Sequence, residues 1–396
     1  MNTSKIGTPQ RPVVFLSYGL GKHSTAATVE LIENPARRDF ELDQLILATA
    51  MTGDEWHSTK IQVSSFLLPL LRAHRIRYVQ LARNGPSERD GITVLSDTDQ
   101  PEEVFTEGIY KLSDEMLQSG VVPSVCGTRK CSLKFKGWVL GQWEKANLAG
   151  LCVRKIIGFH AGELYRVKRE ERFYTGKASP IEHPLIRWGW TDETCIEYLH
   201  NRFGIEWKNS ACDFCMFAGG KPAVIERYRA EPQSGAKAIR IERTARAINP
   251  RITLFSRHSV EDLLRADGNT IAVEEADRVL AAQSWKLMRV RRIRYSKTIT
   301  HRRTESIACG TRAAMDERLR LESEARDVAL TYEGGHARIY LRRIPEAKPY
   351  PHAEEMITIA PATVKDKCRA NFERRWHEIV TQSHLFHASS ISSGSS

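Results

Sequence analysis

Residues 12–33 read PVVFLSYGLGKHSTAATVELIE, and this stretch decides the fold. Its first part, 12–17, is a short apolar run typical of a buried strand, and residues 24–32 predict a helix. Gly19 and Gly21 lie in the turn between them. A strand that passes through a tight glycine turn into a helix is typical of α/β proteins.

The same alternation continues along the chain. Strands are predicted at 43–50, 76–82 and 153–160, and helices at 58–75 and 101–118. Strands that alternate with helices pair in parallel, so the sequence predicts a doubly wound parallel sheet. Because ligands bind such sheets beyond the carboxyl ends of the strands, polar residues at those ends are the candidates for function.

The composition is that of an ordinary globular protein. Of the 396 residues, 41% are hydrophobic and 27% are charged, which excludes a wholly disordered, collagen-like or coiled-coil chain. We find no run of about 18 apolar residues, and the N-terminus MNTSKIGTPQRP is polar, so we expect neither a membrane helix nor a signal peptide. The expected location is the cytoplasm.

The length suggests two domains. We expect an α/β domain over residues 1–220 and a basic, mainly helical extension over 221–396, with a flexible tail from about residue 385. Within the extension, residues 221–303 are rich in arginine and are predicted to be mostly helical. A hairpin is predicted around Gly334-Gly335, because paired glycines accept the backbone angles of a tight turn.

The segment Ser17–Thr25, called the glycine loop below, suits a phosphate or pyrophosphate. Glycines let the backbone approach a ligand closely, and the N-terminus of the following helix favours an anion. The alternative is a plain strand-to-helix turn with glycines for packing. The predicted phosphate ligands combine backbone N–H groups, hydroxyls and one ammonium group: Ser17, Gly19, Gly21, Lys22, Ser24 and Thr25.

Thr52-Gly53-Asp54-Glu55 follows the second predicted strand. Two carboxylates at the carboxyl end of a strand can bind a metal ion or a ribose hydroxyl. We therefore assign Asp54 and Glu55 to such a ligand, with Thr52 and Gly53 beside them. The alternative is a solvated turn.

Four of the eight cysteines form two pairs, which are Cys126 with Cys131 and Cys212 with Cys215. In a cytoplasmic chain such pairs indicate metal ligands more than disulfides. Together they supply four thiolates, enough for Zn²⁺ or an iron–sulfur cluster. The long stretch between the pairs excludes a compact zinc ribbon, so the fold must bring them together.

A last polar segment, Gly158–Arg166, ends the predicted strand 153–160. Glu163 and Arg166 can hydrogen-bond a substrate, or they can form a salt bridge with each other. The sequence alone leaves both interpretations open.

The chain carries 59 Lys and Arg against 48 Asp and Glu, a formal charge of +11. Residues 285–295, WKLMRVRRIRY, interleave basic and aromatic side chains, which predicts salt-dependent binding of DNA or RNA. The alternative is a solvated helix face whose cations pair with the acidic stretch 315–327.

Taken in order along the chain, these segments resemble the PP-loop superfamily, and within it the phosphoadenosine phosphosulfate reductase-like branch. The glycine loop resembles the S-[FY]-G-x-G-x-x-S-T-A motif of the family, and residues 52–55 resemble its TGDE motif. The resemblance covers about residues 11–220 and extends through Arg129–Lys136, Gly158–Arg166, His183–Trp190 and Cys212–Cys215.

The resemblance implies an adenine nucleotide α-hydrolase-like domain over 1–220 that binds ATP, or a sulfated nucleotide such as phosphoadenosine phosphosulfate or adenosine phosphosulfate. ATP-using relatives release pyrophosphate and leave an adenylylated substrate, which a sulfur nucleophile then displaces. The implied cofactors are Mg²⁺ and a [4Fe–4S] cluster on the four cysteines, with Zn²⁺ as the alternative. The residues assigned to catalysis on this basis are Lys22, Asp54, Glu163 and Arg166.

Three functions stay open. The first is an enzyme that adenylylates a substrate for sulfur transfer, with nucleic acid as acceptor and a sulfur-donor protein as partner. It resembles the sulfur-transfer ATPase of DNA phosphorothioation. The second is a sulfonucleotide reductase; the terminal catalytic cysteine of the reductases is absent, so Cys309 is the thiol to test. The third is a nucleotide- or nucleic-acid-binding subunit without turnover. It is suggested by His23, which stands where ATP-using relatives usually have Asp.

Overall fold

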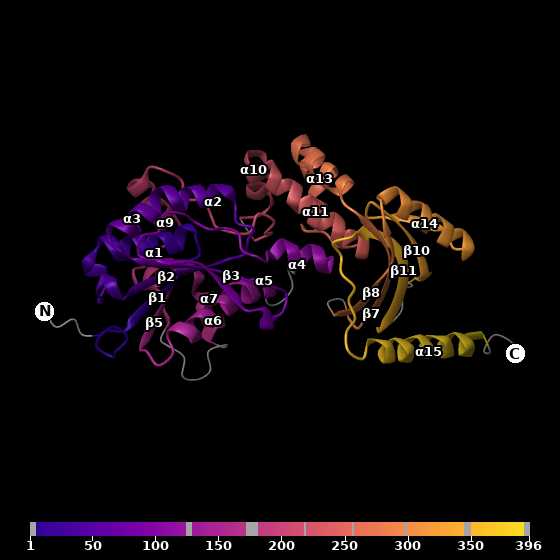
Figure 1. Cartoon of the computed structure of the whole chain (residues 1–396), viewed down its shortest axis with the longest axis horizontal. Coiled ribbons are helices and arrows are strands. Elements are labelled where there is room, and N and C mark those ends of the chain that lie inside the picture. The colour runs from indigo at the N-terminus through magenta and orange to yellow at the C-terminus, as the bar shows by residue number, and fades with distance from the viewer. Residues whose placement is uncertain are drawn as a thin grey trace. The chain divides into compact units, whose positions relative to one another are not determined.

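The computed structural model describes residues 5–123, 129–171, 181–217, 219–255, 257–296, 299–343 and 350–391. The chain divides into two compact units (Figure 1). The N-terminal unit holds residues 1–115 and 128–227, and the C-terminal unit holds 116–127 and 228–396. Among the described helices, none is both long enough and apolar enough to cross a membrane.

The N-terminal unit is built on a six-stranded sheet with the order β4-β3-β2-β1-β5-β6. The strands β1, β2, β3, β5 and β6 are parallel, whereas β4 pairs antiparallel to β3. The predicted all-parallel sheet is therefore wrong at this edge. The link from β3 to β4 is too short for a helical crossover, so β4 folds back beside β3. The strands are β1 (Val13–Ser17), β2 (Leu45–Met51), β3 (Arg77–Arg83), β4 (Ile92–Thr98), β5 (Val153–Ile157) and β6 (Ile181–Glu182).

Alternate side chains of β1 enter two separate apolar layers. Val14 and Leu16 pack with helices α1 (Lys22–Glu33) and α9 (Asp192–Phe203). Val13 and Phe15 pack against α6 (Trp138–Asn147). The sheet is thus covered on both faces, which is why β1 and β2 are almost continuously apolar. Shorter helices complete the unit: α2 (His57–Gln62), α3 (Leu68–Ala73), α5 (Lys130–Ser132), α7 (Leu164–Glu171) and α8 (Pro184–Arg187).

The helix predicted over 101–118 is mostly wrong, because only α4 (Leu112–Ser119) forms. The buried side chain of Gln80 holds the preceding segment extended. Its amide donates to the Glu103 carbonyl at 2.8 Å and accepts from the Phe105 N–H at 2.8 Å. These tertiary hydrogen bonds replace the ones that a helix would supply.

The C-terminal unit contains an antiparallel sheet with the order β8-β7-β11-β10-β9, so the prediction of a mainly helical extension is incomplete. The hairpin around Gly334-Gly335 forms, between β9 and β10. The strands are β7 (Trp285–Arg294), β8 (Thr300–Gly310), β9 (Leu330–Glu333), β10 (His336–Arg342) and β11 (His352–Pro361). The helices are α11 (Pro232–Ile248), α12 (Val260–Ala266), α13 (Thr270–Ala282), α14 (Arg312–Ala325) and α15 (Phe372–Ile391), while α10 (Lys221–Ala230) carries the boundary between the units.

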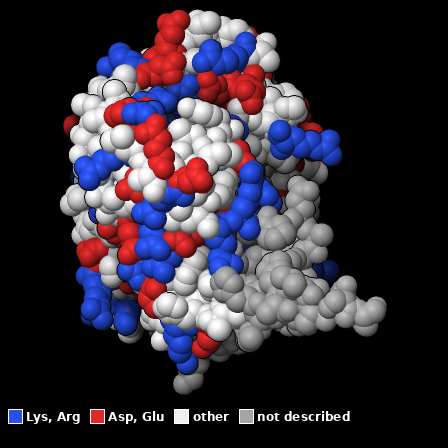
Figure 2. Space-filling view, turned by 90° about the vertical axis from the view of Figure 1, so that its right-hand side faces the viewer, with Lys and Arg blue, Asp and Glu red and all other residues white. Residues whose placement is uncertain are grey.

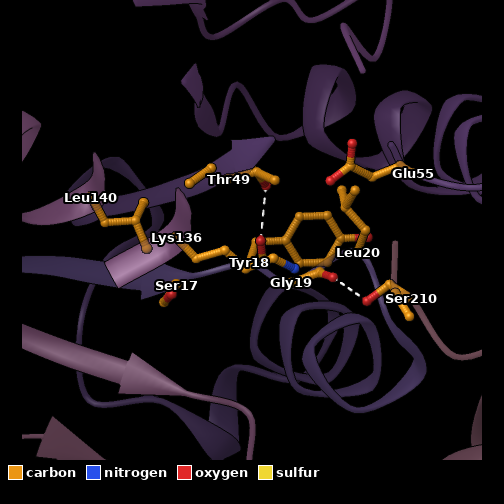
Figure 3. Close-up of a pocket in the computed structure, with 11 residues that line it drawn as sticks. Ser17, Tyr18, Gly19, Leu20, Thr49, Glu55, Lys136, Leu140 and Ser210 are labelled. Carbon is orange, nitrogen blue, oxygen red and sulfur yellow. Dashed lines mark hydrogen bonds between the residues drawn. The ribbon is translucent and has the colours of Figure 1, made fainter. Parts of the chain in front are cut away.

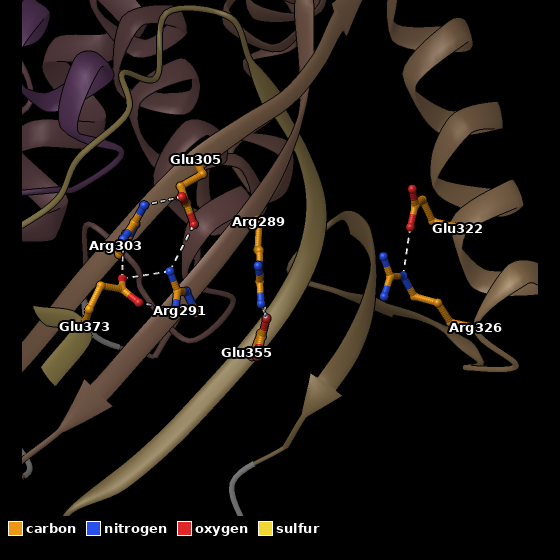
Figure 4. A network of polar contacts seen from close by, with 8 residues as sticks. All are labelled: Arg289, Arg291, Arg303, Glu305, Glu322, Arg326, Glu355 and Glu373. Carbon is orange, nitrogen blue, oxygen red and sulfur yellow. Dashed lines mark hydrogen bonds and ion pairs between the residues drawn. The ribbon is translucent and has the colours of Figure 1, made fainter. Parts of the chain in front are cut away.

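The basic segment 285–294 is strand β7, not a helix. Its arginines pair with glutamates of neighbouring elements rather than with the acidic stretch 315–327, as Figure 4 shows. Arg291 pairs with Glu305 and Glu373, and Arg292 pairs with Glu354. The glutamates of α14 instead pair with arginines of their own helix.

Candidate functional site

The glycine loop lies at the point where the strand order of the N-terminal sheet reverses. From β1 the chain passes through α1 to β2 on one side, while β5 pairs with β1 on the other side. In open α/β sheets the crevice beyond the carboxyl ends of two such strands is where ligands bind. Here the glycine loop follows β1 and residues 158–163 follow β5.

Internal hydrogen bonds hold the glycine loop in shape. Gly21 is the N-cap of α1, and Leu20 adopts a left-handed backbone with φ of 63°. The Ser24 hydroxyl accepts from the Gly19 N–H at 3.2 Å and donates to the Gly21 carbonyl at 3.0 Å. Thr25 is fully buried and donates to the same carbonyl at 2.9 Å. Ser24 and Thr25, two of the predicted phosphate ligands, therefore also hold the loop in its conformation.

A small cavity of about 40 Å³ opens beside the loop (Figure 3). Ser210 closes one side, because its hydroxyl donates to the Gly19 carbonyl. This volume suits about one water molecule and is too small for a whole phosphate group in the present arrangement. The cavity is lined by Ser17, Tyr18, Gly19, Leu20, Thr49, Ala50, Glu55, Lys136, Leu140, Ser210 and Ala211.

The two carboxylates of the 52–55 turn are occupied by protein donors. Glu55 accepts from the N–H and the hydroxyl of Thr52, each at 2.8 Å, and from the Gly53 N–H at 3.1 Å. Burial raises the pKa of Glu55. Asp54 is 1% exposed, accepts from the Ser113 N–H at 2.7 Å and is not among the residues that line the cavity. The two carboxylates do not fit a Mg²⁺ site in this arrangement.

Three of the four predicted cysteine ligands lie in the described part of the chain, and Cys126 lies outside it. Cys131, Cys212 and Cys215 are partly buried free thiols. The Cys215 N–H donates to the Cys212 carbonyl at 2.9 Å in a tight turn. The backbone of Cys212 forms an isolated antiparallel β-bridge with Glu55. Burial raises the pKa of both thiols, and the Cys131 thiol raises that of Cys215 further. Of the described cysteines, Cys131 and Cys215 therefore influence each other electrostatically.

Lys22 and His23, at the start of α1, share Asp192 at the start of α9. The Lys22 Nζ lies 2.7 Å and the His23 Nε2 lies 2.5 Å from the Asp192 Oδ1. Burial opposes ionisation of Asp192, but the hydrogen bonds from Lys22 and His23 outweigh it and lower its pKa. Lys22 is 8% exposed. Its ammonium group is thus held beside the first turn of α1.

Glu163 and Arg166 form a salt bridge with each other, which was one of the two interpretations left open by the sequence. The Arg166 Nη1 lies 2.6 Å from the Glu163 Oε1. The guanidinium of Arg166 also stacks 4.0 Å above the centre of the Phe159 ring. On the other side, the Glu163 Oε2 lies 3.8 Å from the His160 Nε2. Glu163 and Arg166, which the sequence assigned to a substrate, are therefore paired with each other after strand β5.

No protein-family model, curated protein or solved structure matches this chain. The site therefore stands on its own geometry. The sequence prediction missed Asp192, Ser210 and Thr49, which lie far from the glycine loop along the chain. Lys136 is the one missed residue with a signal, since it follows Cys131 in a segment that resembles the family.

Proposed function

We propose that this chain is a nucleotide-binding enzyme of the PP-loop type, which transfers the adenylyl group of ATP to a substrate and so prepares it for sulfur transfer. In this reaction a substrate oxygen attacks the α-phosphorus, the bond to the β-phosphate bridging oxygen breaks, and pyrophosphate leaves. The observation that carries the proposal is the glycine loop at the reversal point of the sheet, beside a cavity that Lys136 lines.

The charges around the loop support a phosphate ligand. The N-terminus of α1 contributes a positive dipole and backbone N–H groups. Lys136 lies on the cavity, and Lys22 is fixed by Asp192 at the same helix end. The Lys136 ammonium group and the helix N-terminus would stabilise the charge that develops on a departing pyrophosphate, whereas the charge of Lys22 is balanced by Asp192.

Thiolates select zinc and iron–sulfur clusters, but the thiols of Cys131, Cys212 and Cys215 do not all lie within 4.8 Å of one another, so these segments would have to close on a Zn²⁺ ion. Cys131, Cys212 and Cys215, with Cys126, would hold a [4Fe–4S] cluster or Zn²⁺. A cluster would supply sulfur or electron-transfer chemistry near Glu55, because the backbone of Cys212 forms a β-bridge with Glu55.

A second candidate is nucleotide binding without turnover. The observation that favours it is the occupied state of Asp54 and Glu55, which leaves this turn without a Mg²⁺ ligand set. Reduction of a sulfated nucleotide has weaker support. Cys309 sits in β8 opposite Lys286, so its thiol is held in a strand ladder rather than on a mobile tail.

A nucleic-acid acceptor stays a prediction, and segment 285–294 gives it little support. Arg289, Arg291 and Arg292 pair with glutamates, and Arg292 is buried with Glu354. Figure 2 shows acidic and basic side chains interspersed over the visible face rather than one broad basic surface. Electrostatic binding to phosphates needs cations that are not already paired within the fold.

The test measures binding of ATP and of inorganic pyrophosphate by calorimetry, together with pyrophosphate release from ATP. We expect Lys136→Ala to weaken both affinities at least tenfold. Lys60→Ala is the matched control. Lys60 lies on α2, pairs with Glu103 and does not line the cavity. ATP binding that is unchanged in Lys136→Ala would refute the proposed site. Tight binding with no pyrophosphate release would leave the second candidate.

A further inference from the structure

Two imidazoles and a carboxylate meet beside the glycine loop, and the proposed function uses none of them as a metal site. His23 comes from the start of α1, whereas His160 and Glu163 come from the turn after β5. One donor atom from each lies within 4.8 Å of the others, and among the described residues no other three His, Cys, Asp or Glu do so. We propose that His23, His160 and Glu163 bind one divalent transition-metal ion of the Zn²⁺ type.

The backbone brings these donors together. A Cβ at Gly158 would lie 2.8 Å from the Ser24 Cα, so only glycine lets the end of β5 approach the start of α1 this closely. The centres of the two imidazole rings lie 4.5 Å apart, and the rings are tilted by 35° to each other. Glu163 follows His160 by three residues in a short 3₁₀ turn, Ala161–Glu163, which places its carboxylate on the same side.

The neighbours leave one donor atom of each residue for a metal. Asp192 holds the Nε2 of His23, which leaves Nδ1. Arg166 holds the Oε1 of Glu163. The Oε2 accepts only a long hydrogen bond of 3.4 Å from the His160 N–H and lies 3.8 Å from the His160 Nε2. A carboxylate that orients a metal-binding histidine through its second nitrogen is a recurring feature of such sites.

The formal charges next to the three donors cancel. Asp192 balances the charge of Lys22, and Glu163 balances the charge of Arg166.

The donor types select the class of metal. Imidazole nitrogens suit Zn²⁺, Fe²⁺, Co²⁺ and Ni²⁺, whereas Mg²⁺ prefers oxygen ligands. Bonds of about 2.1 Å require donors roughly 3.4 Å apart in a tetrahedral site. The side chains must therefore move slightly toward the ion. When His160 binds the metal through Nε2, its Nδ1 carries the proton, so the 3.3 Å hydrogen bond from the Gly162 N–H to that Nδ1 must break. Three ligands leave a fourth position for water or a substrate oxygen.

The test titrates the full-length protein with Co²⁺ in the absence of nucleotide, so its outcome is independent of the proposed function. Thiolate-bound Co²⁺ gives a sulfur-to-metal charge-transfer band, and Co²⁺ at nitrogen and oxygen ligands does not. We expect one Co²⁺ per chain without that band. His160→Gln and Glu163→Gln should each weaken its binding at least a hundredfold. Asp192→Asn should weaken it about tenfold, as loss of an orienting partner does.

His200→Ala is the matched control, because it removes an exposed imidazole from α9 outside the cluster. It should leave Co²⁺ affinity unchanged. The proposal fails if the wild-type protein shows no saturable Co²⁺ site free of thiolate absorption. It also fails if folded His160→Gln binds Co²⁺ as tightly as the wild type, with circular dichroism reporting the folded state.

Discussion

At the scale of single residues, Gly158 controls how the crevice is assembled. Its missing side chain allows β5 and α1 to touch, and the obstacle to a larger residue is backbone, with the Ser24 N 3.0 Å from a built Cβ. Backbone cannot rotate away as a flexible side chain can. The position therefore links stability to the geometry of His23 and His160.

We predict that Gly158→Ala lowers the free energy of unfolding by about 1–3 kcal/mol, as overpacking does. Gly141→Ala is the control, because a Cβ there meets nothing within 4 Å. Gly141 lies inside α6, so this substitution should stabilise the protein by up to about 1 kcal/mol. Urea unfolding measures both changes. Equal stability of the two variants would contradict the close approach.

At the scale of elements, β10 begins with a buried histidine against α11. His336 is 5% exposed, and its Nε2–H donates to the Arg243 carbonyl at 2.9 Å. Burial, aided by the charge of Arg338, lowers the pKa of His336 to about 3. Strand β10 thus forms only around a neutral imidazole.

This arrangement makes stability depend on pH. Below about pH 6.5 the unfolded chain binds a proton at His336, but the folded chain does not until about pH 3, so stability falls as the pH falls through that window. The loss from this group should be about 2 kcal/mol between pH 6.5 and 5. His336→Gln keeps a donor for Arg243 and should flatten that part of the urea-unfolding profile. His200→Gln, on the exposed face of α9, should not; a profile unchanged in His336→Gln would contradict the assignment.

At the scale of the whole molecule, the predicted four-thiolate site depends on two cysteine pairs that lie far apart along the chain. We predict that anaerobically purified protein carries about four irons per chain, the content of a [4Fe–4S] cluster, and that Cys212→Ser loses them. One zinc per chain would instead make the site structural. Cys368→Ser, an exposed thiol in the C-terminal unit, is the control. Iron, sulfide and zinc analysis with a visible spectrum measures the outcome, and absence of all metal would refute the four-cysteine site.

Local apolar runs predicted most of the N-terminal sheet. The runs around Phe15, Ile46 and Val79 became β1, β2 and β3, because continuous apolar strands need cover on both faces. Strand β4 was missed, since an edge strand is half-exposed and its pattern is weak. Strand β7 was misread because two of its arginines, Arg291 and Arg292, are buried against glutamates of other elements, which obscured the two-residue period.

The sequence by itself determined the strand–loop–helix unit at residues 13–33 and the position of its loop at the carboxyl end of β1, because short-range propensity and glycine placement act locally. Only the tertiary structure decided which polar groups remain available there. It engaged Asp54, brought Asp192 to His23 across 169 residues, and neutralised the arginines of β7. Such pairings depend on packing between distant segments, and no local pattern encodes them.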